Sequence, residues 1–225
     1  DSGGIRRLII FRNENGIFVN ADEPMGENAG ADNSNIQWGD YDNDGDLDLF
    51  VANNSNNSLY ENNSNGDFIK ITEGIIVNDN CNTKSCIWGD CDNDGFLDLF
   101  IANGQLYLSE SNKLYLNNRD GTFNEVMDGD IVNDEDNSNS CSWADYDNDG
   151  DLDFLITGSS GTEKITLLYE NDEAGSNPNN PPSPPTNLNA EWMLDSAKAL
   201  ATATTALHYL LEGRKRSVVK TVREA

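Results

Sequence analysis

The chain has 225 residues, 36% of them hydrophobic, and a formal net charge of −26 at pH 7. Residues 1–189 hold 8 Lys and Arg against 36 Asp and Glu, whereas residues 190–225 hold 6 against 4. Because residues 1–189 are strongly acidic, this part of the chain repels phosphate groups, which argues against nucleic acid and against an anionic membrane surface as partners. No apolar run approaches the about 18 residues of a membrane helix, and we therefore expect no membrane insertion.

The first residues, Asp1-Ser2-Gly3-Gly4, lack the charged and apolar regions of a signal peptide, which indicates a mature product or a fragment. The stretch from Leu8 to Phe18 then predicts a β-hairpin, because apolar residues flank an Asn-Gly step that favours a tight primed turn. Similar stretches return at 59–68 and 114–123 and predict two more hairpins.

A motif that begins with tryptophan occurs three times, at Trp38–Phe50, Trp88–Phe100 and Trp143–Leu155. Each copy contains the pattern D-x-D-x-D-G-x-x-D and leads into a short apolar run that is typical of a buried strand. Repetition at intervals of 50 and 55 residues, with strands on either side, predicts a propeller or a linear array of β-sheets.

Four carboxylates fall within nine residues of each copy. Two unit charges about 4 Å apart repel by roughly 4 kcal/mol at an effective dielectric of about 20, so a compact loop of this kind needs a cation. Flexible oxygen ligands favour Ca²⁺ over Mg²⁺, which demands a tighter octahedron. We therefore predict about three Ca²⁺ ions per chain. The predicted ligands are four side chains and one main-chain carbonyl per loop: Asp40, Asp42, Asp44, Asp48 and the carbonyl of Asp46; Asp90, Asp92, Asp94, Asp98 and the carbonyl of Phe96; Asp145, Asp147, Asp149, Asp153 and the carbonyl of Asp151.

The alternative is that these are solvated acidic turns, since Asp, Asn and Gly are ordinary turn residues. Three copies in one register favour the metal loop. An EF-hand is excluded, because its twelfth position requires a Glu and a following helix, whereas Val51, Ile101 and Ile156 stand there within β-prone runs.

This strand–loop–strand arrangement resembles the FG-GAP or VCBS repeat of integrin-α-like β-propellers, over about residues 1–175. The resemblance implies an all-β fold of four-stranded antiparallel blades, with Ca²⁺ in a loop at the edge of each blade. It predicts a partial blade at 1–22 and blades at about 36–72, 86–127 and 140–172, the last without its fourth strand. A closed propeller takes about 4–8 blades, so we expect a partial ring that joins the rest of a larger propeller or self-associates.

Residues 176–186 form a Pro-rich linker, because five of the six prolines lie there. Two interpretations of the tail at 187–225 stay open. Its Ala and Leu content favours a helix from Ala190 to Ala225, and the stretch Pro184–Ala190 resembles the start of a fibronectin type III domain.

Two sets of aromatic residues recur at fixed repeat positions, and for both we expect core packing rather than sugar stacking: Trp38, Trp88 and Trp143, and Tyr60, Tyr115 and Tyr169. Cys86, Cys91 and Cys141 are expected to be small apolar fillers, and a disulfide between Cys81 and Cys86 stays open.

The only histidine, His208, lies in the tail, which leaves no histidine-based catalytic site in the repeats and predicts that the chain is not an enzyme. We expect a calcium-binding module of a secreted or cell-surface protein, where Ca²⁺ is abundant, acting in adhesion through an unidentified protein or glycan ligand. The alternatives are a part of a propeller-type polysaccharide lyase and a structural spacer in a long adhesin.

Overall fold

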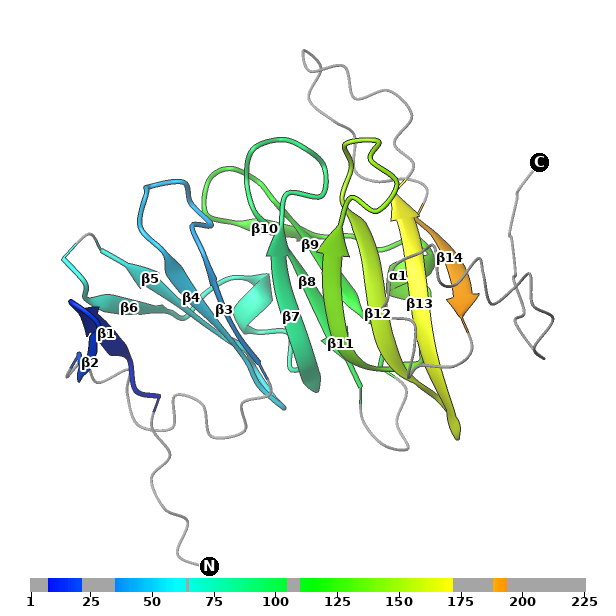
Figure 1. Ribbon diagram of the computed structural model, residues 1–225, viewed down its shortest axis with the longest axis horizontal. Helices are drawn as coiled ribbons and strands as arrows, with labels where there is room; N and C mark the ends of the chain where they lie inside the picture. Colours follow the sequence, from blue (N-terminus) through cyan, green and yellow to red (C-terminus); the bar gives the residue numbers. More distant parts are fainter. Residues whose placement is uncertain (1–7, 22–34, 64, 105–109, 172–187, 194–225) are drawn as a thin grey trace, which may run out of the picture.

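The structure is a computed structural model that describes residues 8–21, 35–63, 65–104, 110–171 and 188–193 (Figure 1). Its first element is a hairpin of β1 (Phe11–Glu14) and β2 (Ile17–Asn20). The two turn residues, Asn15 and Gly16, have φ angles of 55° and 90°. Positive φ at both positions is the primed geometry that matches strand twist, so the hairpin prediction is confirmed.

Three antiparallel sheets follow, each with four strands in sequence order. The first contains β3 (Asn35–Gly39), β4 (Asp48–Ala52), β5 (Ser58–Asn62) and β6 (Phe68–Ile71). The second contains β7 (Thr83–Gly89), β8 (Asp98–Asn103), β9 (Lys113–Asn117) and β10 (Phe123–Glu125). The third contains β11 (Asn137–Ala144), β12 (Asp153–Ser160), β13 (Glu163–Asn171) and β14 (Leu188–Met193). These sheets confirm the predicted all-β fold of four-stranded antiparallel blades in a partial propeller.

Strand β14 differs from the prediction. The third blade was expected to stop after β13, but Leu188 pairs with Asn171 and Met193 pairs with Thr166 to complete the sheet. Residues 190–193 are therefore strand and not helix. The sequence concealed this pairing because no short hairpin turn joins the two strands, although the open edge of β13 offers a full row of backbone partners. The rest of the predicted tail, 194–225, lies outside the described residues, and the division into domains stays a prediction.

The later hairpin turns also differ from the first. Asn62 pairs with Phe68 and Asn117 pairs with Phe123, so each connection has five residues rather than two. A main-chain bond of 2.9 Å from the N–H of Asn118 to the carbonyl of Thr122 closes the second of these loops. The Asn-Gly and Asp-Gly steps predicted the hairpins correctly and the turn type wrongly.

The sheets lie side by side, with the first strands β3, β7 and β11 as neighbours (Figure 1). The central sheet is covered on both faces, because Leu99 and Ile101 pack toward the first sheet while Phe100 and Ala102 pack toward the third. Full burial of one such large apolar side chain contributes roughly 1.5–3 kcal/mol. Packing between the blades, rather than within one sheet, therefore forms the core.

Glycines after the first two tryptophans bring neighbouring blades together. A Cβ atom at Gly39 would lie 2.6 Å from Trp88, and one at Gly89 would lie 2.6 Å from Trp143. Trp88 is accordingly only 8% exposed, whereas Trp38, at the outer face of the first sheet, is 46% exposed. Core packing is thus confirmed for Trp88 and wrong for Trp38, because in the described residues no preceding blade covers it.

The connections between blades repeat as well. A 3-10 helix, η1 (Ile75–Val77), lies between the last strand of the first blade and the first strand of the second. A short helix, α1 (Asp130–Asn133), has the same place between the second and third blades. Both belong to a Gly-x-Ile-Val-Asn-Asp repeat at 74–79 and 129–134 that the sequence reasoning missed. The Ile-Val pairs are buried, and the final acids, Asp79 and Asp134, accept hydrogen bonds from tyrosine hydroxyls.

Those hydroxyls belong to Tyr115 and Tyr169, at O···O distances of 3.2 Å and 2.7 Å. Both tyrosines and Tyr60 are buried, which confirms their predicted core role. All four cysteines are free, so the Cys81–Cys86 disulfide is not formed. Within the part of the chain that the structure describes, no helix has the length and apolarity that a membrane span requires.

Candidate metal loops

Each aspartate loop connects the first strand of a blade to its second strand. Two residues with positive φ reverse the chain direction in every loop. In the first loop they are Asn43 at 59° and Gly45 at 96°, and the other two loops have the same pair of residue types. Asn tolerates this conformation better than other residues that carry a Cβ, which explains why the middle of each loop reads Asp-Asn-Asp-Gly.

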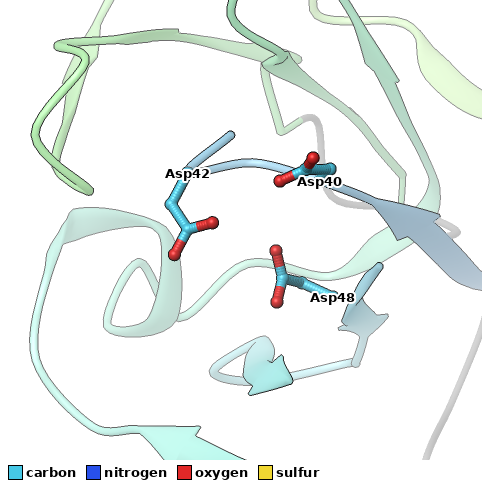
Figure 2. Close-up of side chains that lie close together, drawn as sticks. All are labelled: Asp40, Asp42 and Asp48. Carbon is cyan, nitrogen blue, oxygen red and sulfur yellow. The ribbon is translucent and has the colours of Figure 1, made fainter. Parts of the chain in front are cut away.

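This folding gathers three carboxylates in each loop. Figure 2 shows the carboxylates of Asp40, Asp42 and Asp48 turned toward one shared space. In every loop, one oxygen from each of three aspartates lies within 4.8 Å of the other two. The clusters are Asp40, Asp42 and Asp48; Asp90, Asp92 and Asp94; and Asp145, Asp147 and Asp153.

One predicted side-chain ligand in each loop falls outside these clusters: Asp44, Asp98 and Asp149. Asp44 Oδ1 accepts the N–H of Asp46 at 2.9 Å, and Asp149 Oδ1 accepts the N–H of Asp151 at 2.9 Å. Both oxygens of Asp98 accept backbone N–H groups. The remaining predicted positions, the main-chain carbonyls of Asp46, Phe96 and Asp151, lie in the same loops, and the complete ligand sets stay a prediction.

The last aspartate of each loop has a second role that the sequence did not reveal. Asp48, Asp98 and Asp153 are buried at the first position of β4, β8 and β12. Each accepts one backbone N–H from its own loop and one from the end of the third strand. For Asp98 these donors are Cys91 at 2.9 Å and Asn117 at 2.9 Å. The acid therefore clamps the loop to the sheet.

Burial makes these carboxylates unfavourable as anions. Desolvation raises the pKa of Asp48 to about 6 and that of Asp98 to about 6. The pKa of Asp92 rises to about 7, first through desolvation and then through repulsion by Asp98, Asp94 and Asp90. A divalent cation at the cluster would lower these pKa values again, because it favours the charged form of each acid.

Two oxygens in the clusters have no protein partner. Asp40 Oδ1 and Asp92 Oδ1 are buried and form no hydrogen bond. Leaving a buried charged acceptor unpaired is expensive, and most buried polar atoms in proteins are paired. Hard carboxylate oxygens that converge without donors fit a cation of the calcium class.

The second loop differs from the others by a basic neighbour. Arg119 Nε lies 2.7 Å from Asp94 Oδ2, and the Asp94 side chain is nearly covered. The Arg119 side chain is 46% exposed, so this ion pair adjusts the charge of the loop more than it stabilises the fold.

Sequence reasoning also missed the role of the asparagines that end the third strands: Asn62, Asn117 and Asn171. Each donates its backbone N–H to the clamping aspartate of its own blade. A Tyr-x-Asn pattern at 60–62, 115–117 and 169–171 marks these positions and could have revealed them.

A family model described as FG-GAP-like repeat matches residues 40–101 and 90–156, which together span just over half of the chain. The chain belongs to the FG-GAP-like repeat family. Each FG-GAP-like match begins at the first aspartate of one loop and ends in the strand that follows the next loop. The repeat thus covers the contacts between blades as well as the loops. No curated protein matches the chain.

Proposed function

We propose that this FG-GAP-like chain is a calcium-binding β-propeller module of a secreted or cell-surface protein. The observation that carries the proposal is the convergence of three carboxylates in each loop, with the partnerless buried oxygens of Asp40 and Asp92 among them. When bound, Ca²⁺ supplies the positive charge that these clusters lack. The residues that would hold it are the aspartates of the three loops, and we propose no enzymatic role for them.

The exposed apolar surface supports a larger propeller as the immediate partner. Trp38 and Ile36 of β3 are exposed. They lie on the face of the first blade that corresponds to the faces by which the second and third blades pack against the blade before them. Ala144 stands where the first two blades have Gly39 and Gly89, the positions at which a Cβ would collide with a tryptophan. If a second copy of the chain stacked head to tail on this one, Trp38 of one copy would collide with the Cβ atom of Ala144 of the other. We therefore propose that Trp38 is covered by a preceding blade that has a glycine at this position.

In an assembled propeller the loops between strands face solvent and would present the module to a protein or glycan ligand in adhesion. This role rests on the family, whose repeats are typical of extracellular proteins. Binding to a glycan array at millimolar Ca²⁺ would support a glycan ligand, whereas a structural spacer would bind none of the glycans.

The direct test of the calcium proposal is calorimetric titration of metal-free protein with Ca²⁺, followed by thermal melts in excess Ca²⁺ and in EGTA. We expect about three ions per chain. At a free concentration of about 100 times Kd, one site stabilises the fold by about 2.7 kcal/mol, which raises Tm by roughly 5–10 °C in a chain of this size.

A matched pair of variants makes the test specific. Asp92→Asn should remove one bound ion, because Asp92 lies in the second cluster, whereas Asp67→Asn changes an exposed aspartate outside the loops and should keep all of them. A folded protein that binds no Ca²⁺ and melts identically in EGTA would show that the loops are solvated turns.

A further inference from the structure

Direct hydrogen bonds connect the aspartate loops of neighbouring blades. Asn43 in the first loop donates its Nδ2 to the carbonyl of Gly95 in the second loop, at 3.0 Å. Asn93 in the second loop donates its Nδ2 to Asp151 Oδ1 in the third, at 2.7 Å. The residue between the second and third aspartates of a loop therefore reaches forward to the next loop.

A second set of bonds reaches backward from the asparagines that end the third strands. Asn117 Nδ2 lies 2.7 Å from the carbonyl of Tyr41, in the loop of the preceding blade. Asn171 Nδ2 lies 3.0 Å from the carbonyl of Cys91, again one blade back. Each adjacent pair of loops is thus joined twice, by bonds of opposite direction.

The backward bonds are continuous with the aspartate clamps. The N–H of Tyr41 donates to Asp48 Oδ2, and its carbonyl accepts from Asn117. The N–H of Asn117 donates to Asp98 Oδ1. Asp98 Oδ2 in turn accepts the N–H of Cys91.

From Cys91 the same pattern continues into the third blade. Its carbonyl accepts from Asn171, whose N–H donates to Asp153 Oδ1 at 2.9 Å. Asp48, Asp98, Asp153, Asn117 and Asn171 are all buried, so solvent does not compete for these bonds. One path of buried hydrogen bonds therefore runs through the clamps of all three loops.

We infer that the three loops bind divalent cations as a coupled array, in which ordering one loop pre-orders its neighbour through Asn117 and Asn171. The inference rests on the proposed calcium function. A cation fixes the aspartates of its loop and with them the peptide unit that the next blade's asparagine contacts. The second cation then meets a loop that is already ordered, so its affinity is higher, and the effect is reciprocal.

The charge of the first cation opposes this coupling, because it lessens the attraction of the next loop for a second cation even though each loop carries at least four aspartates. The titrations are therefore run in about 1 M salt, where the Debye length is about 3 Å and this repulsion is largely screened. Because one hydrogen bond between neutral groups shifts an equilibrium by about 2- to 12-fold, we expect coupling of that size for each pair of loops.

The test is a mutant cycle read at the second loop, with the amide NMR signal of Cys91 followed during Ca²⁺ titration. Asp147→Asn disables the third loop, and Asn171→Ala removes the bond to Cys91. In the wild-type background, Asp147→Asn should weaken Ca²⁺ binding at the second loop by about 2- to 12-fold. In the Asn171→Ala background the effect should be smaller, because only the bond from Asn93 to Asp151 still joins the two loops.

Asn103→Ala is the matched control. Asn103 is also buried and donates its Nδ2 to the carbonyl of Ser111, at 2.9 Å, but at the end of β8 away from the loops. The effect of Asp147→Asn should persist in this background. If Asn171→Ala does not fold, the same cycle is run one blade earlier: Asp92→Asn disables the second loop, Asn117→Ala removes the bond to Tyr41, and the amide signal of Tyr41 reports binding at the first loop.

The outcomes separate the two proposals. Wild-type protein that binds no Ca²⁺ overturns the calcium function itself. If the wild-type protein binds Ca²⁺ but Asp147→Asn changes the affinity of the second loop equally in all backgrounds, or in none of them, the coupling alone is overturned.

Discussion

Replacing Trp88 with alanine tests whether contacts between blades stabilise this protein. Trp88 is 8% exposed and packs against the rings of Tyr41, Phe50 and Phe123, with centroids 6.2, 5.8 and 6.0 Å away. Truncating a buried tryptophan typically costs about 3–5 kcal/mol. In a chain of about this length, each kcal/mol lowers Tm by roughly 2–4 °C, so the expected loss is about 6–20 °C.

Trp38→Ala is the control, because Trp38 has the same place in the motif but is 46% exposed, with Phe68 as its ring partner at 5.9 Å. We expect it to cost less than about 2 kcal/mol. The assay is thermal unfolding followed by far-UV circular dichroism in excess Ca²⁺. Equal losses in the two variants would refute the argument, since they would mean that burial between blades adds nothing.

Three further predictions concern the blade contact, the second loop and a buried acid. Gly39→Ala should lower the free energy of unfolding by about 1–3 kcal/mol in urea titrations, because its Cβ would lie 2.6 Å from Trp88; unchanged stability would contradict the close packing. Arg119→Asn should strengthen calorimetric Ca²⁺ binding at the second loop a few-fold at low salt, since it frees Asp94, and this gain should shrink in about 1 M salt, where charges are screened. Burial raises the pKa of Asp79 above its ordinary 3.8, so the stability that its protonated form contributes is complete below pH 3.8 and is lost as the pH rises through the raised pKa. Asp79→Asn should therefore show a smaller loss of unfolding free energy between pH 4 and 7 than the wild-type protein, and parallel pH profiles would argue against a raised pKa.

Local sequence determined the strands and loops of this protein. The Asp-Asn-Asp-Gly step has two residues that accept positive φ, and the alternation of turn residues with β-prone runs predicted the antiparallel β-sheets. The candidate aspartates were visible for the same reason, because four acids in nine residues can converge only in a tight loop.

Tertiary structure decided what each of these residues does. Trp38 and Trp88 share one motif, yet only Trp88 is buried, because only Trp88 has a neighbouring glycine to pack on. Asp98 serves as a clamp because Asn117, 19 residues later, donates its N–H to it. The bond from Asn117 back to Tyr41 spans 76 residues. No periodicity within one repeat encodes such contacts, because they depend on how successive blades pack and not on the conformation of either segment alone.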